Sequence, residues 1–187
     1  MELKPEMFKR FLPLPVTLIT TVDQKGTPNA APYSCVMPIL RPLDLIALAS
    51  ALPRDTLRNI RETNEFVVNV MGNPSFRKAI KCAKSYPPEI NELEEVDLET
   101  ISSKKVSSPR VKDAIGWIEA RVEKEVIGER YSLIIGKVLC SEINDLYLER
   151  ERLIETPMVM LIPDFRLIGE RVAKREEFEK EIASIKF

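Results

Sequence analysis

Short runs of β-branched and apolar residues, separated by turn signals, follow one another closely through the first half of this chain. Residues 16–22 (VTLITTV) precede a turn at 23–26 and a second extended run at 27–37, a pattern that predicts an antiparallel hairpin. Residues 45–50 (LIALAS) are almost wholly apolar, as in a strand buried on both faces, and Pro53 ends this run. The spacing favours an antiparallel sheet or barrel over a doubly wound fold.

Two short helices are predicted between the strands. Asp55 stands as a capping residue before Leu57 and Ile60, which have helical spacing, so a helix should begin near Asp55. Residues 74–83 also have a helical pattern, with proline near the first turn, where its missing amide has little effect. Between these helices, residues 65–70 (EFVVNV) predict another strand.

The second half of the chain is expected to complete the barrel. Residues 84–109 are polar and lack periodicity, which indicates a long excursion that is either folded over the barrel or partly mobile. Residues 117–126 alternate between a core face and a second face, and residues 131–140 continue in the same manner. A helical connection is predicted over 146–154 and an amphipathic C-terminal helix over 173–185.

Length and charge narrow the class of protein. The chain has 187 residues, 44% of them hydrophobic, which is typical of one well-packed domain, so we expect a single domain over 1–187. Its 28 basic and 29 acidic side chains give a net charge of −1, which indicates neither nucleic acid nor an anionic membrane as the main partner. No apolar run approaches the roughly twenty residues of a membrane span. The first residues lack the apolar core of a secretory signal, and we expect a soluble, cytoplasmic protein.

The sequence contains no histidine. Catalysis by serine–histidine or cysteine–histidine pairs and histidine metal sites are therefore excluded. Cys35, Cys82 and Cys140 are widely separated and form no CxxC pair, so they predict neither a disulfide framework nor a zinc site, and we expect no bound metal. Any chemistry carried out by this chain should depend on a cofactor.

A candidate anion site lies where the apolar run 45–50 leads into the predicted helix. A loop at a helix start offers free backbone amides and a partial positive charge, to which the chain adds the hydroxyls of Ser50 and Thr56 and the guanidinium of Arg54. This combination suits a phosphate group. The alternative is an ordinary aspartate or threonine cap beside a solvated arginine.

Four consecutive blocks, taken together, resemble the flavin reductase and flavoredoxin family. They are residues 15–21 (PVTLITT), 26–34 (GTPNAAPYS), 54–60 (RDTLRNI) and 65–70 (EFVVNV). The resemblance implies a mainly β fold with peripheral helices, namely an FMN-binding split β-barrel of antiparallel Greek-key type, with a barrel core over about residues 12–170. It also implies a homodimer.

The resemblance further implies which residues would hold flavin mononucleotide (FMN), and it assigns no catalytic side chain. The implied contacts are Tyr33, Ser34, Cys35 and Val36 for the flavin ring, Ala49 and Ser50 for the ribityl chain, and Arg54, Thr56 and Asn59 for the phosphate. The sequence has no GxGxxG fingerprint for a dinucleotide pyrophosphate, which favours FMN over FAD.

One departure from the family bears on the electron donor. Many of these flavin reductases have an aspartate–histidine pair just before the strand that here begins near Tyr131, whereas this chain has Glu129 and Arg130. Arg130 either holds an anionic donor or projects into solvent.

The sequence is therefore consistent with three functions. The first is a flavoprotein oxidoreductase that passes electrons from NADH or NADPH, through bound FMN, to free flavin, ferric iron or a partner protein. The second is a flavoredoxin-like electron-transfer protein without nicotinamide reductase activity. The third is a flavin-free split-barrel module that serves in dimerisation.

Apolar residues outside the barrel strands also favour a homodimer, although they could instead pack back onto their own barrel. They are Phe8, Phe11, Leu12 and Leu14 ahead of the first strand and Phe178, Ile182 and Ile185 near the C-terminus.

Overall fold

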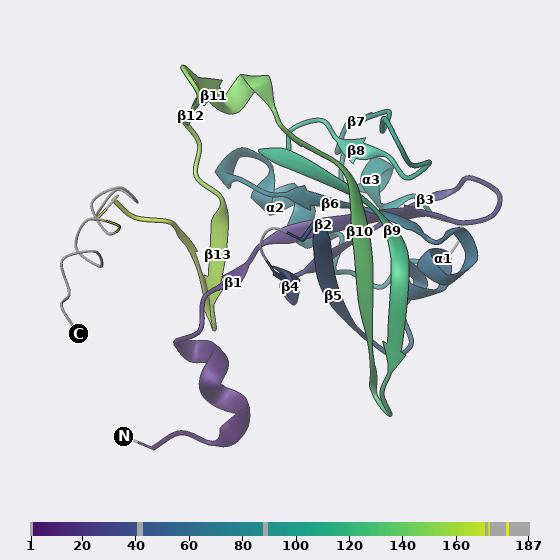
Figure 1. Cartoon of the computed structure of the whole chain (residues 1–187), viewed down its shortest axis with the longest axis horizontal. Helices are drawn as coiled ribbons and strands as arrows, with labels where there is room; N and C mark the ends of the chain where they lie inside the picture. The colour runs from purple at the N-terminus through teal and green to yellow at the C-terminus, as the bar shows by residue number, and fades with distance from the viewer. Residues whose placement is uncertain (1, 41–42, 88–89, 171, 173–178, 180–187) are drawn as a thin grey trace.

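The main body of the protein is a seven-stranded antiparallel sheet, described by a computed structural model that covers residues 2–40, 43–87, 90–170, 172 and 179. The strand order is β3-β2-β6-β9-β10-β5-β4 (Figure 1). The predicted mainly β, antiparallel fold is confirmed. The strands are β2 (Thr17–Val22), β3 (Pro28–Tyr33), β4 (Val36–Pro38), β5 (Leu45–Ala51), β6 (Glu65–Val70), β9 (Gly116–Ile127) and β10 (Tyr131–Ile143).

The two edges of this sheet are joined by a very short link. Strands β3 and β4 are consecutive in the chain and lie at opposite ends of the strand order, yet only Ser34 and Cys35 separate them. The sheet must therefore curl until its edges approach each other, which makes it a half-barrel. The extended run predicted over 27–37 is therefore divided into two strands, because β3 pairs with β2 and β4 pairs with β5. Between these two strands, the carbonyl of Cys35 accepts a hydrogen bond from the amide of Ala49 (2.9 Å), next to the β4–β5 pairing. We call the Ser34–Cys35 link the seam.

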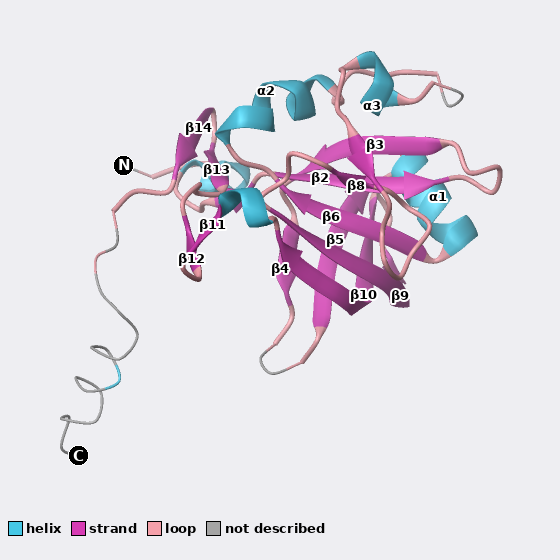
Figure 2. Ribbon diagram, turned by 90° about the horizontal axis from the view of Figure 1, so that it is seen from above, coloured by secondary structure: helices cyan, strands magenta, loops and turns pink. Residues whose placement is uncertain are grey.

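The helices lie outside the curled sheet (Figure 2). They are α1 (Asp55–Thr63), α2 (Asn73–Lys81), α3 (Glu92–Glu95) and two 3₁₀ turns, η1 (Pro5–Arg10) and η2 (Asp145–Tyr147). The two helices predicted between the strands are present, as α1 and α2. The prediction that Asp55 caps α1 is wrong, because Arg54 occupies the N-cap position without a side-chain cap bond and Asp55 pairs instead with Arg58 (2.8 Å). None of the helices in the described ranges is long and apolar enough to cross a membrane.

Alternating side chains of the sheet build two apolar cores, one on each face. On β2, Ile19 belongs to an inner cluster with Phe66 and Ile134, which α1 closes with Leu57. Leu18, the neighbouring residue of β2, belongs to the outer cluster, which is covered by α2 and the segment after it. This cluster also includes Val67, Ala79, Leu93 and Trp117. Both faces of β2 are therefore buried.

The described parts of the polar stretch, 84–87 and 90–109, lie against the outer face, which is the first of the two alternatives expected from the sequence. It contains α3 and β7 (Thr100–Ile101), which pairs with β8 (Arg110–Val111). Under this segment Glu119 is fully buried, although it belongs to the face of β9 opposite the predicted core face. Its carboxylate pairs with the buried Arg110 (2.5 Å) and accepts the amides of Lys104 (2.8 Å) and Lys105 (2.6 Å). A carboxylate of the sheet thus fastens the excursion to the barrel.

A second, smaller unit extends from the barrel at the end remote from α1 (Figures 1 and 2). It is a three-stranded sheet of β1 (Leu14–Pro15), β13 (Met158–Leu161) and β14 (Asp164–Leu167), preceded by η1. The helical connection predicted over 146–154 is wrong: η2 leads into a hairpin of β11 (Leu148–Glu149) and β12 (Arg152–Leu153), whose turn residues have positive φ. The helix predicted over 173–185 falls outside the described residues, save for residue 179.

Candidate functional site

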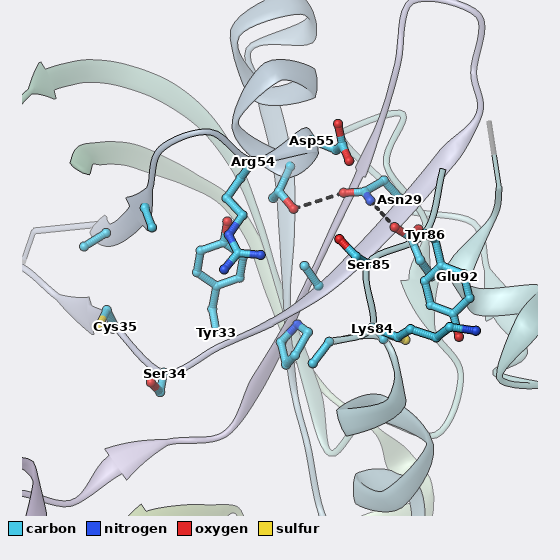
Figure 3. Close-up of a pocket in the computed structure, with 17 residues that line it drawn as sticks. Asn29, Tyr33, Ser34, Cys35, Arg54, Asp55, Lys84, Ser85, Tyr86 and Glu92 are labelled. Carbon is cyan, nitrogen blue, oxygen red and sulfur yellow. Dashed lines mark hydrogen bonds between the residues drawn. The ribbon is translucent and has the colours of Figure 1, made fainter. Parts of the chain in front are cut away.

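A cavity of about 300 Å³ opens beside the seam, between the end of β3, the end of β5, the first turn of α1 and the start of the excursion (Figure 3). This volume is at the lower limit of the usual range for small-molecule sites. Six residues predicted to hold FMN line it: Tyr33, Ser34, Cys35, Ala49, Arg54 and Thr56. Two of the four blocks that suggested the family, residues 26–34 and 54–60, therefore meet at this cavity.

The other three predicted contacts are not among the lining residues. Val36 packs against the inner core cluster. Ser50 is 2% exposed, and its hydroxyl lies 2.8 Å from the hydroxyl of Tyr33. Asn59 is also 2% exposed and donates a hydrogen bond to Thr21 (3.2 Å). Ser50 and Asn59 lie behind the cavity, where they orient other polar side chains.

The start of α1 supplies the positive end of the cavity. Arg54 directs its guanidinium towards Tyr33 rather than back onto its own helix (Figure 3), and within the described ranges it forms no ion pair. The side chain of Arg54, the N-cap residue, makes no hydrogen bond to the first turn of α1. The backbone amides of this turn therefore lack the side-chain cap that a helix start usually has. An uncapped helix start beside an unpaired guanidinium is suited to binding an anion.

A chain of hydrogen bonds between buried side chains forms the opposite wall. The hydroxyl of Thr56 donates to Oδ1 of Asn29 (3.0 Å), and Nδ2 of Asn29 donates to Oε1 of Glu92 (2.5 Å; Figure 3). The second carboxylate oxygen of Glu92 accepts the amide of Ala30 (3.0 Å). Behind them, the hydroxyl of Thr21 also points to Oδ1 of Asn29 (3.3 Å). Strand β3, α1 and the excursion are thus joined at the cavity.

Burial changes the acidity of two groups in this wall. Desolvation raises the pKa of the Glu92 carboxyl, and the nearby charge of Asp55 adds to this effect, while the donors at Ala30 and Asn29 oppose it. Desolvation also raises the pKa of the Cys82 thiol to about 12, with a further contribution from Glu92. Cys82 is therefore an inert thiol at neutral pH, whereas Cys35 is exposed at the seam.

Part of the cavity was not predicted from the sequence. Asn29 and the segment that supplies Lys84, Ser85, Tyr86 and Glu92 line the cavity, but the sequence assigns neither of them a ligand contact. Only one signal pointed to Glu92, namely its position between the apolar residues 90 and 93. Residues 84–86 carry no pattern that distinguishes them from an ordinary loop.

Arg130, the residue that replaces part of the family's aspartate–histidine pair, does not line the cavity. Its side chain is exposed at the turn between β9 and β10. Its carbonyl accepts the amide of Leu52 (3.3 Å), which lies just before the start of α1. The turn is therefore coupled to the cavity loop through its backbone.

A curled antiparallel sheet with a short link between its edges, and with helices outside it, is the split-barrel fold of flavin reductases. The chain belongs to the flavin reductase-like domain family, whose model matches residues 8–156. Proteins of this family typically bind flavin and are often NAD(P)H:flavin oxidoreductases.

Three known proteins illustrate the similarity. An uncharacterised protein of Methanothermobacter thermautotrophicus is 47% identical over 146 residues, which are 75% of this chain and 69% of the relative. Component B of the nitrilotriacetate monooxygenase of Bacillus cereus is 25% identical, with a TM-score of 0.81 over 93% of this chain and 98% of its own. Flavoredoxin of Methanosarcina acetivorans shares the fold, with a TM-score of 0.83 at 16% identity over 97% of this chain and 98% of its own.

Proposed function

We propose that this chain is an FMN-binding oxidoreductase that passes electrons from NADH or NADPH to free flavin, ferric iron or a partner protein, and that it works as one domain. The observation that carries the proposal is Arg54, which forms no ion pair within the described part of the chain and stands at the uncapped start of α1, where it opens onto the cavity formed at the seam. Bound FMN would supply the redox chemistry, since it accepts a hydride and releases electrons singly or in pairs. Family membership supports the flavin.

The residues of this chain would bind and orient the cofactor. In the proposal, the segment Tyr33–Cys35 contacts the flavin ring and Ala49 contacts the ribityl chain, while Arg54 and the backbone amide of Thr56 hold the phosphate. Of the predicted contacts outside the lining, Ser50 holds the Tyr33 hydroxyl and Asn59 supports the wall through Thr21. Amides near the flavin's pyrimidine edge would stabilise negative charge in the reduced ring.

The cofactor is tested by its identity and stoichiometry. Purified protein should show flavin absorbance, and chromatography of the flavin released by denaturation should give FMN. FAD as the main released flavin would contradict the choice of cofactor. A protein that binds no flavin, even after incubation with FMN, would instead support the flavin-free dimerisation module.

A flavoredoxin-like carrier is the second candidate, favoured by one observation: Glu129 and Arg130 stand where the family's aspartate–histidine pair is expected, and both are exposed away from the cavity. Anaerobic mixing with NADH or NADPH separates the two candidates. Bleaching of the flavin within seconds supports the reductase, whereas a flavin that stays oxidised supports the carrier.

We also propose that the protein is a homodimer whose second subunit completes the flavin site. A cavity of about 300 Å³ is small for a large planar ring. In the segment ahead of β1, the side chains of Phe8, Phe11 and Leu12 are 44%, 70% and 45% exposed, whereas Phe178, Ile182 and Ile185 lie outside the described residues. Such apolar side chains suit an interface. Sedimentation over a dilution series tests this, and a monomer that retains flavin would contradict it.

A further inference from the structure

The buried hydrogen bonds behind the cavity all run in one direction. Asn59 donates to Thr21, Thr21 and Thr56 both donate to Oδ1 of Asn29, and the side-chain amide of Asn29 donates to Glu92. The series ends on a carboxylate, whose other oxygen accepts a backbone amide. We call these side chains the Glu92 relay.

The carboxylate fixes this direction. Both oxygens of Glu92 face N–H groups, at 2.5 Å from Asn29 and 3.0 Å from the amide of Ala30. If the Asn29 side chain turned over, its carbonyl oxygen would face a carboxylate oxygen at the same short distance, and two acceptors in contact repel each other. Asn29 must therefore direct its NH₂ group to Glu92 and its oxygen to the two threonines.

The same constraint fixes the direction of the hydrogen bond between the Thr56 hydroxyl and Asn29. A hydroxyl has one proton, and that of Thr56 lies on Oδ1 of Asn29 at 3.0 Å, shorter than the 3.3 Å bond from Thr21. Removing it would leave a buried carbonyl with only the longer bond, which is unfavourable. Thr56 lines the cavity although it is only 2% exposed, and the part of its hydroxyl that can meet a ligand there is an oxygen lone pair and not the proton.

The charges of the wall agree with this assignment. Asp55 and Glu92 both line the cavity near Thr56, and two carboxylates would repel a phosphate placed between them. Lys84 also lines the cavity, and its Nζ lies over the ring of Tyr86, at 5.0 Å from the centroid. The cation of Arg54 lies on the other side of the helix start, where its side chain extends towards Tyr33 (Figure 3). A neutral group that donates a hydrogen bond is the better partner for Thr56.

We propose that Glu92 is a positioning residue that sets the hydrogen-bond polarity of the flavin site, so that the Thr56 hydroxyl accepts a hydrogen bond from a ribityl hydroxyl of the flavin and does not bind its phosphate. This inference rests on the proposed flavin site. It changes the role expected of the Thr56 side chain from the family resemblance, and it gives a role to a residue of the excursion.

Three flavins that differ by one part each provide the test: lumiflavin, which has the ring alone, riboflavin, which adds the ribityl chain, and FMN, which adds the phosphate. Their dissociation constants are measured by fluorescence titration of flavin-free protein. Thr56→Val should weaken riboflavin and FMN equally, by about threefold to tenfold, and should leave lumiflavin unchanged. Thr56→Ser, which keeps the hydroxyl, should restore both affinities. Weakening of FMN alone would overturn the proposal, because the hydroxyl would then serve the phosphate.

Glu92→Gln tests the positioning role. Its NH₂ group must face Asn29, since its oxygen is needed by the amide of Ala30; Asn29 then turns over, and Thr56 becomes an acceptor within the wall. Riboflavin should weaken by less than in Thr56→Val, because a ribityl hydroxyl can also accept the hydrogen bond that Thr56 would then donate, and lumiflavin should be unchanged. In the Thr56→Val background, Glu92→Gln should have no further effect on riboflavin.

Two other outcomes have distinct meanings. Equal weakening of all three flavins by Glu92→Gln would overturn the inference, because it would mark Glu92 as a structural support only. Failure of the wild-type protein to bind any of the three flavins would refute the proposed function, and the inference with it. Thermal melts of each variant establish that the proteins compared are folded.

Discussion

The ion pair between Arg110 and Glu119 should dominate the attachment of the excursion to the barrel. The side chains of Arg110 and Glu119 are 4% and 0% exposed, and their closest atoms are 2.5 Å apart. Arg110 also pairs with Glu142 (2.5 Å) and lies over the ring of Trp117, at 5.1 Å from its centroid. Arg110→Met removes the cation and keeps most of the aliphatic bulk, so the change measures the charge.

The expected loss follows from what remains around Glu119. Removing one partner of a buried ion pair usually costs about 3 to 5 kcal/mol, because the other charge stays buried without compensation. Here Glu119 keeps two hydrogen bonds, from the amides of Lys104 and Lys105. We therefore expect Arg110→Met to lower the free energy of unfolding by about 3 kcal/mol, the lower end of that range.

Chemical denaturation monitored by circular dichroism measures this loss. An exposed ion pair of β9, the strand that contains Glu119, gives a matched control. Arg121 pairs with Glu65 at 2.8 Å, but its side chain is 55% exposed; Arg121→Met should cost at most about 1 kcal/mol. If both variants lose less than about 1 kcal/mol, the reasoning about the buried pair is refuted. Should Arg110→Met not fold, Glu119→Gln provides a milder version of the same comparison.

Three further predictions concern the cavity and the barrel interior. Arg54→Ala should weaken FMN by about 1.5 to 3 kcal/mol, the scale of a hydrogen bond to a charged group, and leave riboflavin unchanged; equal titrations for wild type and variant would remove Arg54 from the site. Gly136→Ala should destabilise the barrel by about 1 to 3 kcal/mol, because the new Cβ would lie 2.7 Å from Cζ of Phe66; a denaturation midpoint equal to that of wild type would contradict this. Iodoacetamide should modify the exposed Cys35 well before Cys82, whose pKa is raised to about 12, as peptide mass mapping can check, and FMN should slow the reaction at Cys35.

Local patterns predicted most of the barrel because they reflect local physics. The β-branched run that forms β2, the apolar run that forms β5 and the start of α1 lie at or within one residue of the predicted positions. Each depends on side-chain periodicity or helix spacing within a few residues. The candidate cavity was predicted in part, because six of the nine residues to which the resemblance assigned flavin contacts line it.

Features that depend on distant parts of the chain were not predictable in the same way. In the alternating pattern of β9, Glu119 has the position of a solvent-facing residue. It is buried because the excursion covers it and donates backbone hydrogen bonds to its carboxylate. Glu92 acts on Asn29 across 63 positions of sequence, a separation that no local pattern encodes. The hairpin of β11 and β12 was mistaken for a helix because its turn depends on Arg150 and Glu151 adopting positive φ, which the sequence does not favour.

The strand order also has a consequence for synthesis of the protein. Strand β5 pairs with β4 on one side and with β10 on the other. Ala51 can therefore pair with Tyr131 only after the chain has been synthesised as far as β10. Ribosomes add about 5 to 20 residues per second, and the open side of this apolar strand therefore stays without its partner for several seconds in each nascent chain. An exposed strand edge is a template for association between chains. Protection of β5 by chaperones should thus matter most before residue 143 has left the ribosome, and ribosome-bound chains truncated before β10 should aggregate more readily than chains that include it.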